Sequence, residues 1–212
     1  MIDTVRRRML LGLGAVVLTP RTMAAMTTNV SNVPGIELPR PYAVDARRVM
    51  EFFTFTCPYC REMSSNFAYW GRTLPGGLQF EAVPVVTGKV DMTGALFFFA
   101  VRRVAPEKLD LFMGHAYALI QDAGKPLDNP NTFYEAAQRA GIPRNTLDAK
   151  LRSPSIQADA EMALQRVRAY KIEYTPSLAL MGQYLVHAGH TNGDYRLLLQ
   201  LANGLISQYV PR

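Results

Sequence analysis

The two cysteines of this chain have only two residues between them, in the segment Cys57-Pro58-Tyr59-Cys60. The segment follows the apolar run 49–56, which is typical of a buried strand. Pro58 suits the first position of a helix, because its missing N–H costs nothing there and its fixed φ matches the helix. The sequence therefore predicts a strand that leads to Cys57 and a helix, residues 58–72, that begins directly after it.

A cysteine at the start of a helix is well placed for thiol chemistry. A thiol attacks as its thiolate, and unpaired backbone N–H groups and the positive end of the helix dipole stabilise that anion. We therefore interpret Cys57 as the nucleophile and Cys60, one turn later and facing inward, as the resolving thiol. Pro58 and Tyr59 lie between them and would tune the redox behaviour of the pair.

Three other interpretations compete with a redox site. A structural zinc site needs about four ligands, usually from paired Cys/His clusters, and the chain has no further cysteine to supply them. A purely structural disulfide would close a loop so short that it removes little chain entropy, and it would strain its own geometry. Two inert buried thiols are disfavoured by the Pro-Tyr dipeptide at a junction between strand and helix.

Neither a metal nor an organic cofactor is expected. His187 and His190 form the only pair of nearby histidines, and without acidic or cysteine companions we interpret them as loop or edge residues. His115 lies within a predicted helix and is more typical of a packed or surface residue than of a catalyst.

The N-terminus has the parts of a bacterial export signal, which we place at residues 1–24. Basic residues 6–8 come first, the apolar stretch 9–18 follows, and small residues come next at 24–25. The apolar part is shorter than the roughly 20 residues that a stable membrane span needs. We therefore expect cleavage and no stable membrane insertion; an amphipathic N-terminal helix is the alternative. The twin-arginine and the general secretory routes both fit the segment.

The charge of the mature chain excludes an obvious nucleic-acid footprint. Cleavage would remove four basic residues and one acidic residue, so the formal net charge of +6 would fall to +3. No basic cluster with interleaved aromatic residues remains, so we expect no nucleic-acid partner. An exported protein reaches an oxidising compartment, here the periplasm, where a lone Cys-X-X-Cys pair can act as a disulfide carrier.

The order of the remaining elements predicts an α/β fold. Residues 25–46 are rich in proline and indicate an extended lead-in, with a short edge strand near 36–38. A strand, the helix 58–72 and a second strand at 78–86 predict a βαβ unit with a parallel pair of strands. Residues 177–188 then predict an antiparallel hairpin, and a last helix follows.

A helical pattern occupies the middle of the chain, from residue 93 to residue 170. Gly and Pro residues divide this region into several helices, including one over 106–123. Thr132 with Glu135 has the capping-box pattern of a helix start, and Ser153-Pro154 marks another start. We therefore place an inserted helical subdomain at 93–170.

This order of elements resembles a thioredoxin fold with a helical insertion, and more closely the DsbA-type thiol:disulfide oxidoreductases of bacterial periplasms. The resemblance rests on the segments 51–60 and 174–177 and on the position of the insertion between them. It implies a central mixed sheet and a thioredoxin-like domain made of residues 47–92 and 171–212.

The resemblance also implies roles for three further residues. Pro176 would be the cis-proline that family members place beside the nucleophile, so Thr175 and Pro176 are expected to bind substrate. Glu51 occupies the position of a buried acidic residue, where burial would raise its pKa and let it relay the proton of Cys60. For Glu51 a solvent-facing position or a purely structural hydrogen bond stays open.

Tyr59 departs from the best-known oxidases of this family, which have histidine at its position. DsbA itself is the familiar extreme example of a lowered cysteine pKa, and that value does not transfer to a chain without the histidine. Each pKa unit by which Cys57 is less acidic would shift the reduction potential by about 30 mV towards a less oxidising value.

The resemblance implies a dithiol oxidase that acts on cysteine-containing exported proteins. A membrane quinone-linked partner would reoxidise it. A disulfide reductase or isomerase is one alternative, and a non-enzymatic peptide-binding assembly factor is another. Isomerases of this fold usually carry an N-terminal dimerisation domain, which the short lead-in is too small to build, so we expect a monomer.

Overall fold

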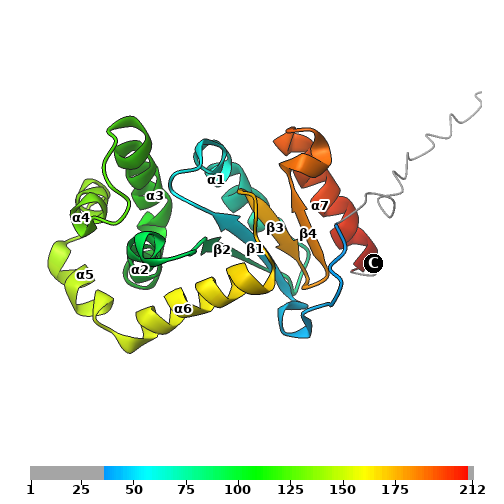
Figure 1. Ribbon diagram of the computed structural model, residues 1–212, viewed down its shortest axis with the longest axis horizontal. Coiled ribbons are helices and arrows are strands. Elements are labelled where there is room, and N and C mark those ends of the chain that lie inside the picture. Colours follow the sequence, from blue (N-terminus) through cyan, green and yellow to red (C-terminus); the bar gives the residue numbers. More distant parts are fainter. Residues whose placement is uncertain (1–35, 210–212) are drawn as a thin grey trace, which may run out of the picture.

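The computed structural model of the protein describes residues 36–209 (Figure 1). The expected export signal, residues 1–24, and most of the lead-in lie outside these residues. Over the range 36–209, no helix has the length and hydrophobicity of a membrane span.

A four-stranded mixed sheet forms the centre of the fold, with the strand order β2-β1-β3-β4. Strand β1 (Arg48–Phe53) pairs in parallel with β2 (Gln79–Pro84) and antiparallel with β3 (Ser177–Leu180). Strand β4 (Tyr184–His187) completes the hairpin with β3. The parallel pair and the hairpin are confirmed. Strand β1 has neighbours on both sides and is covered on both faces, so after Arg48 its residues are all buried, and Glu51 is the one acid among apolar side chains.

The lead-in protects the β4 edge of the sheet. Glu37 forms a single antiparallel bridge with Tyr184, and the N–H of Leu185 donates to the carbonyl of Ile36 at 2.8 Å. The N–H of Leu38 donates to the carbonyl of Gln183 at 2.7 Å. The edge strand expected near 36–38 is therefore present as one bridge, which satisfies backbone groups that an open edge would expose.

Helices α1 (Pro58–Gly71) and α7 (Tyr195–Tyr209) pack on one face of the sheet. The buried residues of α1 recur at helical spacing, which gives the helix one apolar stripe. This stripe consists of Cys60, Met63, Phe67 and Trp70. Burial of each large apolar side chain contributes about 1.5–3 kcal/mol. The stripe therefore fixes the start of α1, and with it the cysteine motif, against the sheet.

Five α-helices lie between β2 and β3 in the chain and form the helical part at one side of the sheet (Figure 1). They are α2 (Lys89–Val104), α3 (Leu109–Tyr117), α4 (Pro130–Arg139), α5 (Arg144–Leu151) and α6 (Pro154–Ala169). Helix α6 returns to the sheet, where Tyr170 directly after it lies 5.7 Å from Phe52, measured between ring centroids. The α/β class with inserted helices is confirmed, while the limits 47–92, 93–170 and 171–212 stay a prediction.

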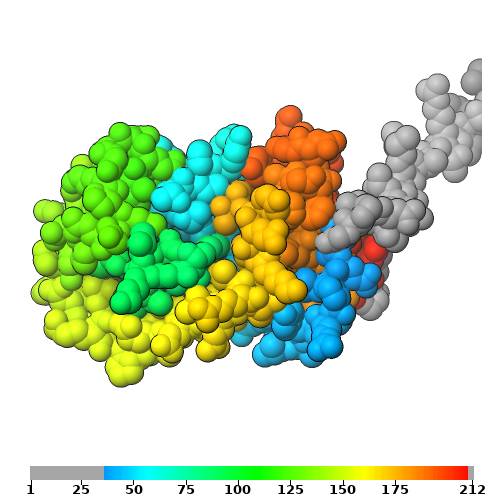
Figure 2. All heavy atoms as spheres, in the orientation of Figure 1, coloured from blue at the N-terminus to red at the C-terminus, as the bar shows by residue number. Residues whose placement is uncertain are grey.

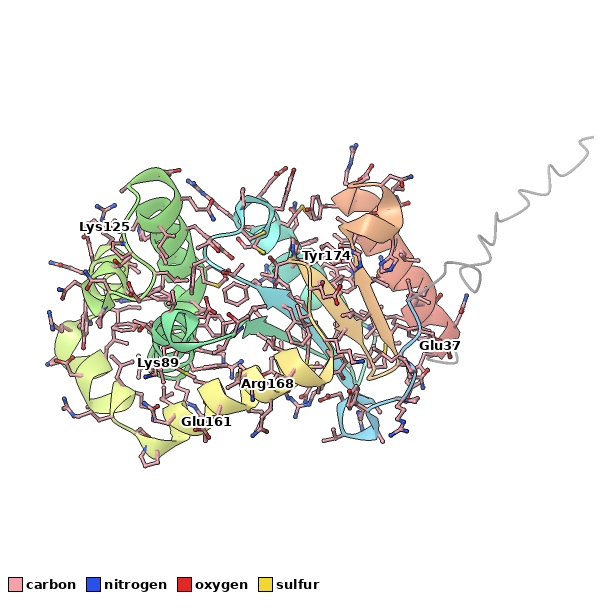
Figure 3. All side chains as sticks on the ribbon, viewed as in Figure 1. Glu37, Lys89, Lys125, Glu161, Arg168 and Tyr174 are labelled. Carbon is pink, nitrogen blue, oxygen red and sulfur yellow. The ribbon has the colours of Figure 1, made fainter. Side chains whose placement is uncertain are left out.

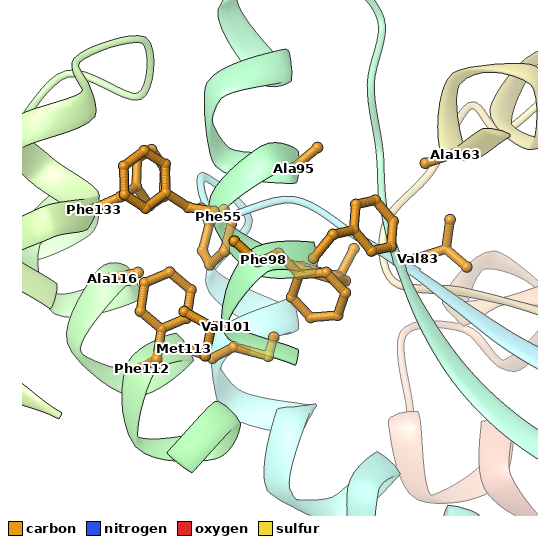
Figure 4. Close-up of a cluster of buried hydrophobic side chains, with 14 of the residues drawn as sticks. Phe55, Val83, Ala95, Phe98, Val101, Phe112, Met113, Ala116, Phe133 and Ala163 are labelled. Atoms are coloured by element: carbon orange, nitrogen blue, oxygen red, sulfur yellow. The ribbon is translucent and has the colours of Figure 1, made fainter. Parts of the chain in front are cut away.

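Phe55 joins the helical part to the loop that carries the cysteines. Its ring lies 5.3 Å from that of Phe133 on α4 and 5.4 Å from those of Phe53 and Tyr117. Figure 4 shows Phe55 among Phe98, Phe112 and Phe133 in this cluster of buried side chains. Because Phe55 is two residues before Cys57, the packing of the insertion fixes the backbone that enters the cysteine motif.

Two of the predicted helices differ from the structure. Helix α4 begins at Pro130, with Asn129 as its N-cap, so the predicted start at Thr132 is wrong. The Asn129-Pro130 pair places proline at the first helical position, and the Thr132 hydroxyl instead donates to the carbonyl of Pro126. The helix predicted over 106–123 is present as a continuous helical stretch, but its winding changes: a 3-10 turn at Pro106–Lys108 precedes α3, and a π-helical turn, η4 (Ala118–Asp122), follows it.

Candidate active site

Cys57 is the N-cap of α1, as the sequence predicts. Its backbone is extended, with φ −84° and ψ 117°, and Pro58 occupies the first turn of the helix. The N–H of Cys60 donates to the Sγ atom of Cys57 at 3.2 Å. The sulfur therefore accepts one of the backbone donors that the start of a helix leaves without a partner.

The loop before β3 supplies the second partner of Cys57. In its protonated form, the Cys57 thiol donates to the carbonyl oxygen of Thr175 at 3.2 Å. The Thr175–Pro176 peptide bond is cis, as the resemblance implies. Ser177 directly follows and pairs with Phe52 of β1. This pairing places Thr175 and Pro176 beside the end of β1, where the cysteine motif begins.

The beginning of α1 reaches the surface between the two parts of the molecule. Figure 2 shows this cyan segment between the green helices of the insertion and the orange segments that follow β3. Cys57 is 9% exposed, whereas Cys60 is fully buried behind it, and both are reduced thiols. Only the first cysteine is therefore open to an incoming sulfur atom.

The surroundings of the two thiols give them very different pKa values. The pKa of Cys57 is lowered to about 6, mainly by a hydrogen bond from the Cys60 thiol. Hydrogen bonds from Thr175 and from the backbone N–H groups of Tyr59 and Cys60 lower it further, whereas burial acts in the opposite direction. The hydrogen bond between the two thiols, burial and the charge of Cys57 raise the pKa of Cys60 far above its usual value. At neutral pH Cys57 is the thiolate, and Cys60 holds its proton.

Glu51 lies inside the molecule, on β1. It is 3% exposed, and its Oε1 atom has no hydrogen-bond partner. Burial and the negative charge of Cys57 raise the pKa of Glu51 to about 8. Glu81 on the neighbouring strand differs from Glu51 in having charged partners, because Arg48 and Arg166 donate to its carboxylate at 2.9 and 3.0 Å. Without such a partner, Glu51 keeps its proton at neutral pH.

A cavity of about 210 Å³ leads to Glu51 from the side of α1 and α3. Ser64 and Ser65 of α1 and Asp110 and Met113 of α3 contribute to its lining. The cavity offers the buried carboxyl a route for proton exchange that does not pass the exposed face of Cys57.

Tyr59 points away from the core and is 53% exposed. Its ring packs on that of Tyr195, at the start of α7, with 5.1 Å between the ring centroids. Tyr59 supplies no positive charge to Cys57, so the low pKa of that thiol depends on hydrogen bonds alone.

The structure adds Gln121, which sequence reasoning does not identify. Its side-chain Nε2 donates to the carbonyl oxygens of Phe55 and Cys57, at 2.9 and 3.1 Å. Gln121 reaches them because it lies in the π-helical turn η4 after α3. No spacing or composition signal in the sequence marks such a turn.

Two histidines support the loop beside the cysteines. Tyr174, labelled in Figure 3, stacks on His187 with 4.6 Å between ring centroids. The Nδ1 atoms of His187 and His190 accept backbone hydrogen bonds from Gly189 and His187, so these atoms are occupied. Within the described part of the chain, no group of three or more His, Cys, Asp or Glu side chains could hold a metal ion.

Comparison with known proteins gives a consistent assignment. The Thioredoxin family model matches residues 44–200. A thiol:disulfide interchange protein DsbA from Bordetella parapertussis is 26% identical over 200 residues, which are 92% of this chain and 94% of that protein. The corresponding protein from Azotobacter vinelandii is 27% identical over 177 residues, covering 82% of this chain and 81% of the relative.

Solved structures show the same fold. The crystal structure of Pseudomonas aeruginosa DsbA has a TM-score of 0.71 at 22% identity and covers 82% of this chain and 90% of that one. Reduced DsbA1 from Neisseria meningitidis has a TM-score of 0.68 at 20% identity and covers 82% and 91%. Together with the cysteine motif, these matches show that the chain belongs to the thioredoxin family and is a DsbA-type thiol:disulfide oxidoreductase.

Proposed function

We propose that this protein donates disulfide bonds to exported proteins through a redox disulfide between Cys57 and Cys60. The observation that carries the proposal is the difference in pKa and in exposure between the two thiols. The pKa of Cys57 is lowered to about 6 at the open start of α1, and that of the buried Cys60 is raised. A thiolate that is stable at neutral pH is a good leaving group, which favours transfer of the disulfide to a substrate.

The reaction begins with the Cys57–Cys60 disulfide and a reduced substrate. A substrate thiolate attacks Sγ of Cys57, which forms a mixed disulfide and breaks the bond to Cys60. A second substrate thiolate then attacks the substrate sulfur of the mixed disulfide and releases Cys57 as a thiolate. Two electrons pass to the protein, the substrate gains one disulfide, and the protein is left as the dithiol.

Glu51 supplies the proton that Cys60 needs when its bond to Cys57 breaks. The Cys60 thiol has a raised pKa, so it takes a proton at once. Glu51 is a buried acid whose pKa is raised to about 8, and it is therefore protonated and able to give that proton at neutral pH. The cavity beside Glu51 allows the proton to be replaced from solvent.

Thr175 and Pro176 form the substrate-binding backbone. Pro176 has no N–H to donate, and the Thr175 carbonyl already points at the reacting sulfur, 3.2 Å away. An extended substrate segment can pair with the backbone at Thr175 while its cysteine reaches Cys57.

The place of action that we propose is the periplasm. The export signal expected at residues 1–24 and the relatives named thiol:disulfide interchange protein DsbA support this location. The dithiol left after each turnover needs an oxidant, and we propose a membrane quinone-linked partner for that step. We further propose that the protein acts as a monomer.

The test is oxidation of a reduced, unfolded protein with several cysteines by the oxidised full-length mature protein. One disulfide should form in the substrate for each Cys57–Cys60 pair reduced. Cys57→Ser and Cys60→Ser should each abolish the reaction, because neither variant can hold the disulfide that is transferred. Substrate oxidation by Cys57→Ser at the normal rate would refute the role of Cys57.

One observation favours a second function, that of a disulfide reductase or isomerase. Tyr59 supplies no charge, and the Cys57 pKa of about 6 is nearer to the value of about 7 in thioredoxin, a reductant, than to the value of about 3.5 in DsbA. Alkylation of the two cysteines in living cells separates the two functions. A largely oxidised pair supports disulfide donation, and a largely reduced pair supports the reductase or isomerase.

A further inference from the structure

Two buried polar atoms have no hydrogen-bond partner among residues 36–209, namely Oε1 of Glu51 and the hydroxyl oxygen of Tyr117. Tyr117 is fully buried, so its hydroxyl is out of contact with bulk water. An unpaired buried polar group costs about 1–3 kcal/mol, and proteins rarely keep one without a functional reason. The hydroxyl of Tyr117 therefore requires an explanation that packing does not provide.

Tyr117 faces the cysteine motif from the insertion. It is the last residue of α3, and its ring packs against that of Phe55, 5.4 Å away between centroids. Gln121, four residues later, donates to the backbone carbonyls of Phe55 and Cys57. Residues four apart lie on the same face of a helical segment, so this face of α3 and η4 covers the loop that leads to Cys57.

The same face of α3 also adjoins Glu51. Met113, one helical turn before Tyr117, lines the cavity that Glu51 lines. Burial and the negative charges of Cys60, Glu51 and Cys57 all raise the pKa of Tyr117. The phenol therefore stays protonated and is a permanent donor beside the groups that exchange a proton.

We propose that Tyr117 is a positioning residue for the proton transfer, whose hydroxyl donates to the Glu51 carboxylate through one water molecule. This inference rests on the function proposed above. When Cys60 leaves Cys57, the proton moves from the Glu51 carboxyl to Sγ of Cys60, and a buried carboxylate remains. A hydrogen bond from Tyr117 stabilises that carboxylate until solvent returns the proton, and so makes Glu51 a stronger acid.

The experiment compares the oxidised protein with its Tyr117→Phe variant. The pseudo-first-order rate of reduction by a small monothiol is measured from pH 5 to pH 9. A hydrogen bond to a charged group is stronger than one to a neutral group, so without it the rate at neutral pH should fall about tenfold, and the apparent pKa of Glu51 should rise by about one unit. Meanwhile the melting temperature should stay equal or rise, because the change removes an unpaired hydroxyl.

The matched control is Tyr170→Phe. Tyr170 is also buried, but its hydroxyl donates to Asp45 at 2.9 Å and lies away from the cysteine motif. This variant should lose stability and keep the pH profile of reduction. The two phenylalanine variants therefore separate a structural hydroxyl from one that acts in the reaction.

A double variant keeps the test decisive. In a Glu51→Gln background, Tyr117→Phe should change the rate and the pH profile no further, because its target carboxylate is absent. A Tyr117→Phe rate within twofold of the parent, or an equal further loss in the Glu51→Gln background, overturns the inference. Failure of the proposed function is recognised separately, because the parent protein itself would then fail to oxidise a reduced protein.

Discussion

The Sγ atom of Cys57 lies 3.2 Å from the carbonyl oxygen of Thr175, although 118 residues separate the two in the chain. The pairing of β1 with β3 brings them together, because Phe52 and Ser177 are partners in that register. The entire helical insertion therefore lies between Cys57 and Thr175 in the chain, although these two residues are in contact in the fold. Any change in the β1–β3 register would move the Thr175 carbonyl away from the Cys57 sulfur.

The first prediction concerns the acidity of Cys57. The hydrogen bond from the Cys60 thiol is the largest cause of its lowered pKa, so Cys60→Ala should raise that pKa above the value of about 6. The backbone N–H of residue 60 remains and should keep the pKa below the usual 9.0. Thiolate absorbance near 240 nm, followed against pH, measures both values. An unchanged midpoint in Cys60→Ala would contradict this assignment.

The second prediction concerns Glu51 and stability. Its folded pKa of about 8 is above the ordinary 4.5, so its contribution to stability is fully present below pH 4.5 and is lost as the pH rises through 8. Glu51→Gln should therefore stabilise the reduced protein increasingly over this window, by up to about 5 kcal/mol. Urea unfolding at several pH values measures the difference. A difference that is constant with pH would mean that Glu51 is not a buried, neutral acid.

The third prediction concerns Tyr59, which occupies a position where the best-known oxidases of the family have histidine. Tyr59→His should lower the pKa of Cys57, because a protonated imidazole near the thiolate stabilises its charge. Each pKa unit should make the reduction potential about 30 mV more oxidising. Tyr59→Phe is the control, since it keeps the packing on Tyr195 and adds no charge. Equal potentials for the two variants would show that charge at this position does not tune the pair.

The fourth prediction concerns Gln121. Gln121→Leu leaves the carbonyls of Phe55 and Cys57 without their donor and should destabilise the protein by about 1–3 kcal/mol. The control is Asp122→Asn on the same turn, which weakens an exposed ion pair with Arg61 and should cost less than about 1 kcal/mol. Urea unfolding of both variants compares them. Equal stability losses would argue against a role of Gln121 in holding the loop.

Local patterns were sufficient to predict the parts of the site that adjoin the cysteines. The apolar run before Cys57 and the proline after it predict the strand end and helix start, and the alternation after Pro176 predicts the hairpin. These features depend on neighbours in the chain, such as the position of proline in the first turn. The acidic position of Glu51 came from family resemblance, since its burial depends on the elements that cover β1.

The contributions of the insertion could not be predicted in this way. Gln121 and Tyr117 reach the site only because α3 changes to a π-helical turn and packs on Phe55. That change depends on tertiary packing, which periodicity does not encode. The wrong start at Thr132 has a similar cause, because two start signals lie close together and the Asn129-Pro130 pair is the one used.

The most direct test of the account is the reduction potential of the Cys57–Cys60 pair, measured by equilibration with glutathione buffers. The Cys57 pKa of about 6 lies between the values of about 3.5 for DsbA and about 7 for thioredoxin. A Cys57 pKa between these two values predicts a potential of about −190 to −250 mV, between the roughly −120 mV of DsbA and the roughly −270 mV of thioredoxin. A value at or below about −270 mV would contradict disulfide donation and would mean that the pair is built to reduce.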